Sequence, residues 1–346
     1  MTETIPLWVQ IIKVCVLLVG FVCIAPVAVW AERRFAGFMQ LRLGPNRVGP
    51  FGILQPIADA IKLLFKEEYF PKNVNKGLFL LAPFLALFVA LFVFTVVPIA
   101  APLELMNGQV IYLQAANPNI GILFVLAISS LMVLSIMLAG WSSNSKYSFL
   151  GALRSSAQMV SYELAMSLAV VSAVLVYGTV DLQQIVMAQS GIKWGVLVQP
   201  LACLIYLIAM FAESNRAPFD LPEGEQEIVA GYHTEYGGMK FASFFFAEYL
   251  NAGSLSAIMV TLFFGGWHGL EWIGHLFNAG PIVIALLQVS AFVGKLAFFI
   301  FLFIWVRWTY PRFRYDQLMR LGWKVLLPFA LLNLMVSALL IYWGIL

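Results

Sequence analysis

The chain has 346 residues, of which 62% are hydrophobic and 11% are charged, with a formal net charge of +3. Soluble globular domains carry roughly 25% charged residues, so this composition excludes a soluble domain and predicts an all-α, polytopic membrane protein. Cys15, Cys23 and Cys203 lie in apolar runs without the clustered spacing of metal or iron–sulfur ligands. We therefore expect this chain to bind no metal and no redox cofactor of its own, and we find no motif for nucleic acid.

Eight apolar runs approach the roughly 20 residues that a helix needs to cross a bilayer. They lie near residues 7–31, 78–100, 119–141, 160–178, 195–212, 241–265, 281–306 and 325–345. The fourth and fifth runs are the shortest and are partly polar. The pattern predicts a single membrane domain over residues 1–346, with about eight transmembrane helices.

The segment between the first two spans predicts an amphipathic helix over about residues 52–67. Ile57, Ile61 and Leu64 recur at helical spacing, whereas Asp59 and Lys62 occupy the other face. Such a helix lies in the membrane interface, either as an anchor or as one wall of an opening for a lipid-soluble substrate. Physical chemistry alone favours the anchor, because most such helices only lie in the interface.

The basic residues predict the orientation in the membrane. They concentrate in alternate loops, whereas the loops on the opposite side contain only Lys193. Because basic loops stay inside, both termini are expected outside, which in a bacterial inner membrane means periplasmic.

The loop over residues 213–240 crowds six carboxylates between two apolar runs. They are Glu213, Asp220, Glu223, Glu225, Glu227 and Glu235. Like charges repel one another at a membrane surface, so such groups indicate sites that are protonated, paired or passed by moving charge.

Further ionisable residues fall within or at the ends of the spans: Glu32, Glu163, Glu213 and Glu248, with Lys13 and Lys295. A charge at mid-bilayer costs about 2.5–3.5 kcal/mol on insertion scales. One alternative is a set of static ion pairs, such as Glu248 with Lys295; the other is a proton pathway. We favour the pathway, because the carboxylates outnumber the two lysines.

Four long segments carry a resemblance to a known family. They are ERRFAGFMQLRLGPNRVGPFGILQPIADAIKLLFKE, WSSNSKYSFLGALRSSAQMVSYE, ESNRAPFDLPEGEQEIVAGYHTEYGGMKFASFFFAEY and RWTYPRFRYDQLM. They resemble the H subunit of bacterial NADH:quinone oxidoreductase (respiratory complex I), the counterpart of mitochondrial NADH dehydrogenase subunit 1. Related subunits occur in membrane-bound hydrogenases, which leaves a second parent complex open.

The resemblance implies a position beneath a peripheral arm whose subunits carry FMN and iron–sulfur clusters. With peripheral quinone-module subunits, such a chain forms a chamber for a quinone, expected to be ubiquinone; adjacent membrane subunits and lipid are further partners. Residues that would line or support the chamber are Arg33, Asp59, Arg216, Phe219 and Asp220. Residues of the acidic passage that couples quinone reduction to proton pumping would be Glu32, Glu163, Glu213, Glu223, Glu225, Glu227 and Glu248.

Two functions of other classes remain open on the residues alone. A stand-alone secondary transporter would explain acids within spans, but the sequence shows no internal repeat. A purely structural anchor for a peripheral enzyme would not need the buried acids.

Overall fold

The computed structural model describes residues 6–104, 110–191, 193–221, 224, 229–276 and 280–344. They form mainly helices: α1 (Leu7–Val22), α2 (Ile24–Met39), η1 (Pro50–Gly52), α3 (Gln55–Leu64), α4 (Lys76–Thr95), α5 (Gly121–Ser129), α6 (Leu131–Ser142), α7 (Lys146–Tyr177), α8 (Leu182–Ala188), α9 (Gly195–Val198), α10 (Pro200–Glu213), η2 (Gly231–His233), α12 (Gly238–Phe263), α13 (Glu271–Leu276), α14 (Pro281–Thr309), α15 (Tyr315–Arg320), η3 (Leu321–Leu326) and α16 (Leu327–Tyr342). Strands β1 (Leu103–Glu104) and β2 (Val110–Ile111) pair antiparallel.

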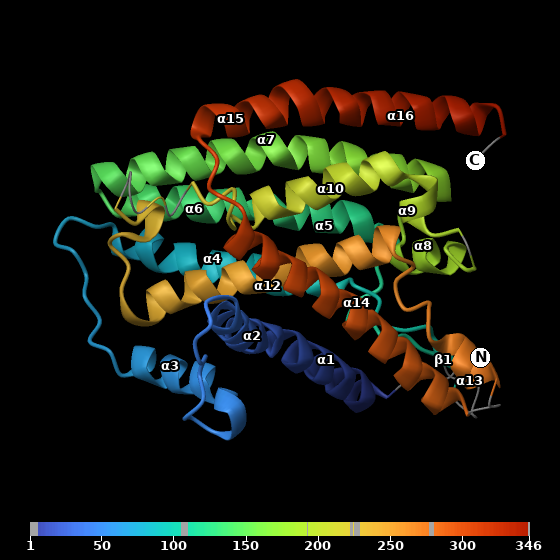
Figure 1. Ribbon diagram of the computed structural model, residues 1–346, viewed down its shortest axis with the longest axis horizontal. Helices are drawn as coiled ribbons and strands as arrows, with labels where there is room; N and C mark the ends of the chain where they lie inside the picture. The colour runs from blue at the N-terminus through green and yellow to red at the C-terminus, as the bar shows by residue number, and fades with distance from the viewer. Residues whose placement is uncertain are drawn as a thin grey trace.

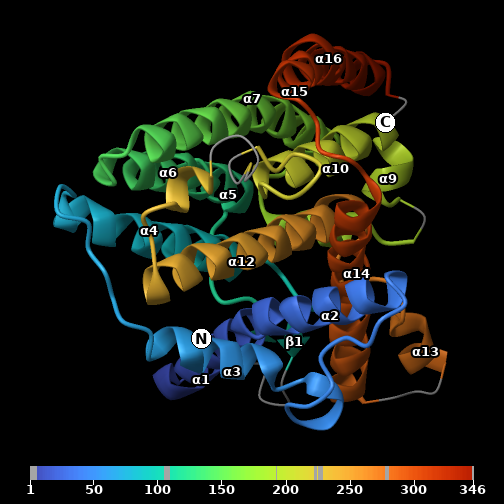
Figure 2. The same ribbon diagram turned by 60° about the vertical axis from the view of Figure 1, so that its left-hand side comes forward.

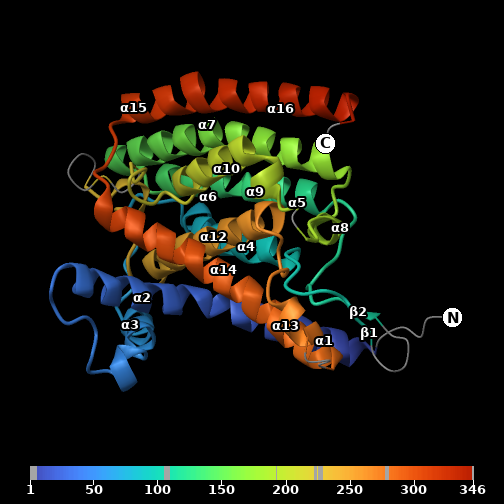
Figure 3. The same cartoon turned by 45° about the vertical axis from the view of Figure 1, so that its right-hand side comes forward.

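The long helices lie side by side in a bundle, with α16 on one flank and α1 and α2 on the other (Figures 1 and 2). Helix α7 packs against α6, α10 and α16, and α12 packs against α4, α10 and α14. The start of α1 and the end of α16 lie at the same end of the bundle, together with α8, α9 and α13 (Figures 1 and 3). The opposite end holds α3 and residues 214–221, which follow α10 (Figure 1).

Seven helical segments in the described part of the chain are long and apolar enough to cross a membrane. The first runs from Leu7 to Met39 through a turn at Cys23, and the fourth covers all of α7 rather than the predicted 160–178. Helix α10 has 14 residues, which is about 21 Å at 1.5 Å per residue and shorter than a bilayer core. The polytopic helical fold is confirmed, whereas the count of eight spans is not.

Helix α12 is the centre of the bundle, because small residues allow its neighbours to approach closely. Its stretch from Ala247 to Phe263 is almost entirely buried. The Ser254 hydroxyl donates to the Ala90 carbonyl of α4 at 3.0 Å, and the Tyr206 hydroxyl of α10 donates to the Leu255 carbonyl at 3.2 Å. These contacts fix the position of α12 along the bundle axis relative to α4 and α10. They therefore also fix the position of Glu248, which α12 carries.

The predicted amphipathic helix is present as α3, which is slightly shorter than the predicted 52–67. Its apolar residues Ile57, Ile61 and Leu64 remain exposed, and so does Phe65 just beyond it. An exposed apolar face beside a membrane bundle fits a helix that lies in the interface.

Candidate functional site

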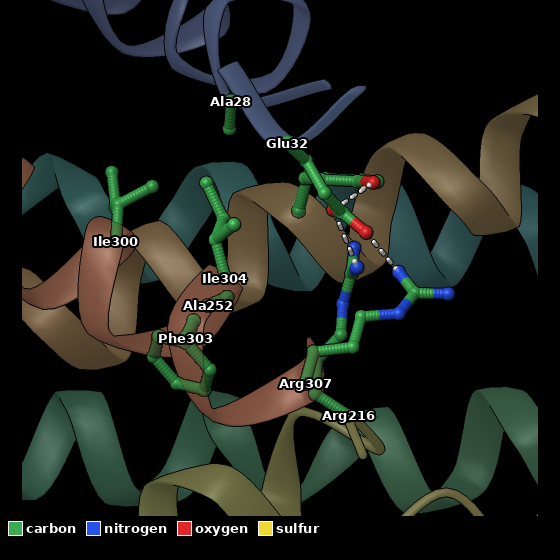
Figure 4. Close-up of a pocket in the computed structure, with 9 residues that line it drawn as sticks. Ala28, Glu32, Arg216, Ala252, Ile300, Phe303, Ile304 and Arg307 are labelled. Carbon is green, nitrogen blue, oxygen red and sulfur yellow. Dashed lines mark hydrogen bonds and ion pairs between the residues drawn. The ribbon is translucent and has the colours of Figure 1, made fainter. Parts of the chain in front are cut away.

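A buried carboxylate, Glu32 of α2, is held by side chains from three other segments (Figure 4). Its Oε1 accepts a hydrogen bond from Arg307 of α14 at 2.7 Å. Its Oε2 accepts from Tyr249 of α12 at 2.7 Å and from Arg216, which follows α10, at 3.3 Å. Only 9% of the Glu32 side chain is exposed, so its charge depends on these donors.

Arg216 is the most enclosed cation of this cluster. Its guanidinium carbon lies 3.7 Å from the centre of the Tyr249 ring, which adds a cation–π contact to the bond with Glu32. Burial alone would lower the pKa of Arg216, but Tyr249, which lies against the guanidinium, and the negative charges of Glu32 and Glu248 raise it. The guanidinium therefore stays charged, and the field of Glu248 reaches the Glu32 cluster.

The cavity between Glu32, Arg216 and Arg307 measures about 20 Å³. That is room for roughly one water molecule and not for a quinone ring. Apolar side chains of α14, Ile300, Phe303 and Ile304, complete its wall (Figure 4). A substrate of quinone size would thus have to lie beside this cluster rather than inside it.

The described part of the acidic loop is attached to α7 by the amide of Gln158. Its Nε2 donates to the Ala212 carbonyl at 2.8 Å and to the Phe219 carbonyl at 2.8 Å. An amide nitrogen has two N–H donors, so both ends of the turn are bound by one side chain. This anchor positions Arg216 beneath Tyr249.

Phe219 and Asp220 connect the same loop to the segment between α14 and α15. The Phe219 ring packs against Phe313 with centroids 5.4 Å apart, and the Phe313 amide donates to the Pro218 carbonyl. Asp220 accepts a hydrogen bond from Arg312 at 2.8 Å. Both predicted residues are buried, and they hold the loop against a basic segment.

Arg33 and Asp59 pair with one another and join α2 to α3. Gln55 also donates to Asp59 at 2.9 Å. Burial raises the pKa of Asp59, but the hydrogen bonds from Arg33 and Gln55 and the charges of Arg33 and Lys62 lower it overall. The pair stands next to the Glu32 cluster in sequence and fixes α3 beside it.

The remaining predicted acids lie at three places. Glu163 of α7 is half-buried, and its charge acts on Glu213, which is buried at the end of α10. Glu248 of α12 is buried and accepts a hydrogen bond from Tyr232 at 3.2 Å. Glu223, Glu225 and Glu227 lie outside the described residues.

The alternative prediction of a static ion pair between Glu248 and Lys295 is wrong. The Lys295 ammonium donates to the carbonyls of Phe264, Gly266 and His268, just beyond the end of α12. Phe264 is 264 − 248 = 16 residues after Glu248, which is about 24 Å along a helix. Lys295 therefore binds backbone carbonyls at the end of the bundle where the termini lie, and it does not pair with Glu248.

Sequence reasoning missed four side chains of this site: Arg307, Arg312, Tyr249 and Gln158. The two arginines were used only to predict orientation, because basic residues at span ends are common there. The signal for all four was their presence in the segments that resemble the known family.

The helical bundle and its buried arginine–carboxylate cluster define a polytopic membrane protein with a charged site at one end of the bundle. The family model for NADH dehydrogenase matches residues 12–338, so the chain belongs to this family. It is 52% identical over 307 residues to the NADH-quinone oxidoreductase H subunit of Protochlamydia amoebophila, covering 89% of this chain and 90% of that protein.

Two further relatives agree. The NADH-quinone oxidoreductase H subunit of Leptospira biflexa is 50% identical over 335 residues, with 93% of each chain covered. NADH-quinone oxidoreductase subunit 8 of Rhodothermus marinus is 50% identical over 324 residues, with 91% of this chain and 92% of that protein covered. The family resemblance predicted from the four segments is confirmed: the chain is a membrane subunit of an NADH-quinone oxidoreductase complex.

Proposed function

We propose that this chain forms the membrane wall of a quinone chamber and carries the effect of quinone reduction to buried carboxylates that take part in proton pumping. The observation that carries the proposal is the Glu32 cluster, where two arginines and a tyrosine converge on one buried carboxylate. The exposed apolar face of α3 beside it suits the isoprenoid tail of a quinone.

The chemistry of quinone reduction supports this location. Reduction to quinol takes two electrons and two protons, and negative charge develops on the ring oxygens before the protons arrive. The electrons would come from an iron–sulfur cluster in a partner subunit, and FMN would lie in the peripheral arm. Arg216 and Arg307 both donate hydrogen bonds to Glu32. Negative charge on a nearby quinone would therefore compete with the Glu32 carboxylate for these two arginines.

Coupling would then follow the charges that already act on one another. Glu248 acts on Arg216, and Glu163 acts on Glu213, which lies three residues before Arg216. A change at Arg216 would alter the proton affinity of this interacting set as a whole. Glu223, Glu225 and Glu227 of the same loop would extend the passage towards the adjacent membrane subunits.

The test compares Glu163→Gln and Glu248→Gln with the control Glu67→Gln, an exposed acid beyond α3. Each change removes a titratable group and nearly preserves shape. Membrane vesicles with the assembled complex are assayed for NADH oxidation by quinone and for acidification by a pH-sensitive dye. We expect Glu163→Gln and Glu248→Gln to reduce acidification and Glu67→Gln to match the wild type. Normal acidification in both passage variants would contradict the proposal.

A second assay addresses the chamber itself. Asp220→Asn weakens the contact between the loop and Arg312, which should move Arg216 and reduce quinone reduction. NADH oxidation by an artificial acceptor that takes electrons from the peripheral arm should stay unchanged. Arg320→Gln, an exposed arginine of α15, is the control. Unchanged quinone reduction in Asp220→Asn would place the chamber elsewhere.

A further inference from the structure

A second and much larger cavity, of about 360 Å³, lies between α1, the end of α4 and α14. Leu17 and Gly20 of α1, Phe94 of α4, and Val293 and Leu296 of α14 are among its walls. Its volume falls in the range of roughly 300–1,000 Å³ typical of ligand sites. All twelve of its lining residues are apolar, and none of them lines the Glu32 cavity.

Lys13 lies about one helical turn before the first lining residues of this cavity, towards the start of α1. It precedes Val16 and Leu17 by three and four residues, so it lies on the same helix face as these two lining residues. Side chains of a helix lean towards its N-terminus, which directs the Lys13 ammonium to the nearer membrane surface. Among the side chains that the structure describes, no carboxylate lies within 4.0 Å of it.

We propose that this cavity binds one acyl chain of a membrane phospholipid and that Lys13 binds its phosphate. The lipid belongs to the leaflet that contacts the start of α1, so it is separate from the quinone chamber at the other end of the bundle. A phosphate supplies the anion that Lys13 lacks within the described chain, and a hydrocarbon chain matches the apolar wall. A quinone carries a neutral headgroup and would leave this cation without an anion.

The energetic reasoning assigns a role to each part. An acyl chain gains little from leaving other lipid chains for an apolar cavity, because both surroundings are equally apolar. Retention of one lipid therefore depends on close packing against the walls and on the contact between ammonium and phosphate. Removing either should release the lipid.

Gly20 offers a clean way to fill the cavity. A Cβ atom built at this position meets no atom within 4 Å, so the side chain of Gly20→Leu starts in open space at the cavity wall. Gly294 of α14 is a matched control, because its added Cβ also meets nothing and it does not line this cavity. Lys13→Gln removes the charge and keeps a polar side chain of similar length.

The experiment uses the assembled complex in vesicles of phosphatidylglycerol, an anionic phospholipid, that carries a photoreactive diazirine in one acyl chain. We expect labelling of residues 16–24 and 289–296, its loss in Gly20→Leu, and unchanged labelling in Gly294→Leu. Lys13→Gln should lower the labelling about fivefold at a limiting amount of probe, which corresponds to one lysine at an anionic surface. A diacylglycerol probe without phosphate should label the wild type about fivefold less, again from one lysine–phosphate contact.

Three results would overturn the proposal. These are absence of labelling in the two segments, equal labelling of Gly20→Leu and the wild type, and equal labelling by the phosphate-free probe. A photoreactive isoprenoid quinone is tested in parallel. If it alone labels these segments, the cavity holds a quinone tail and not a phospholipid.

Discussion

Arg307 donates to Glu32 at 2.7 Å and thereby joins two residues 275 positions apart, one near each end of the chain. The bond ties α14 to α2, and both of these helices pack against the central helix α12. Because Arg216 and Tyr249 share the same carboxylate, four segments of the bundle meet at one side chain.

The cluster predicts unequal effects on stability. Glu32→Gln leaves the buried Arg216 without its anion, which typically costs about 3–5 kcal/mol. Arg307 is about one third exposed, so Arg307→Gln should cost about 1 kcal/mol or less. Thermal unfolding of the purified complex measures both, and the double variant should be less destabilised than the sum of the single changes. An additive result would mean that the two residues do not interact.

The two-ended contact of Gln158 predicts a contrast between two substitutions. Gln158→Glu keeps the shape but presents carboxylate oxygens to the carbonyls of Ala212 and Phe219, so acceptors face acceptors. Gln158→Leu removes the donors, but the Ala212 and Phe219 carbonyls keep the backbone amides of Asn215 and Leu221 as partners, so each lost bond should cost about 0.5–1.5 kcal/mol. We expect both to impair assembly, with Gln158→Glu the worse. The amount of assembled complex on a native gel is the measurement, and normal assembly of Gln158→Glu would show that the loop does not depend on this anchor.

The contact between α2 and α3 should respond to pH only under acidic conditions. The folded pKa of Asp59 is lowered from 3.8, so its pairing stabilises the contact above that value and is lost as pH falls through the lower, folded pKa. Hydrogen exchange of residues 55–64, corrected for intrinsic rates, should therefore be constant between pH 7 and pH 5. Asp59→Asn should exchange faster throughout this range, whereas a pH-dependent wild type would contradict the assignment.

The number of spans can be tested with two reporters. If α10 crosses the membrane despite its 14 residues, the chain crosses eight times and both termini lie on one side. A reporter active only in the cytoplasm is fused before Met1 in one strain and after Leu346 in another. We expect both fusions to be inactive, and an insertion between Lys66 and Asn75 to be active as the control. Opposite results for the two ends would show an odd number of spans.

Composition and apolar runs predicted the membrane class and most helices, because a spanning helix must be long and apolar. The first half of α7 was missed because Ser155, Ser156 and Gln158 lower its hydropathy, although they face the protein interior and not lipid. The runs at 160–178 and 195–212 were the least certain in the sequence: the first belongs to the long helix α7, and the second is the short helix α10. Hydropathy reports exposure to lipid, so it is weakest where a helix is covered by its neighbours.

For the site, sequence reasoning found the acids, because a carboxylate inside an apolar run requires an explanation. It could not find the residues that pair with these acids, since pairing depends on the position of each residue along the bundle axis. Lys295 and Glu248 both lie within spans, yet Lys295 binds carbonyls beyond the end of α12, whereas Glu248 lies further back in that helix and binds Tyr232. Arg307, at the end of its span, had a sufficient explanation as an interfacial residue, although it also binds Glu32.

Gln158 and Glu163 are five residues apart on α7, and Gln158 binds both ends of the turn that contains Glu213 and Arg216. The turn is thus attached to helix α7 at both of its ends. A ligand that displaces this turn cannot move one end alone without breaking a hydrogen bond to Gln158, so the turn and α7 must move together. Displacement at Arg216 would therefore reach Glu163 as motion of α7 itself, the helix on which both Gln158 and Glu163 lie.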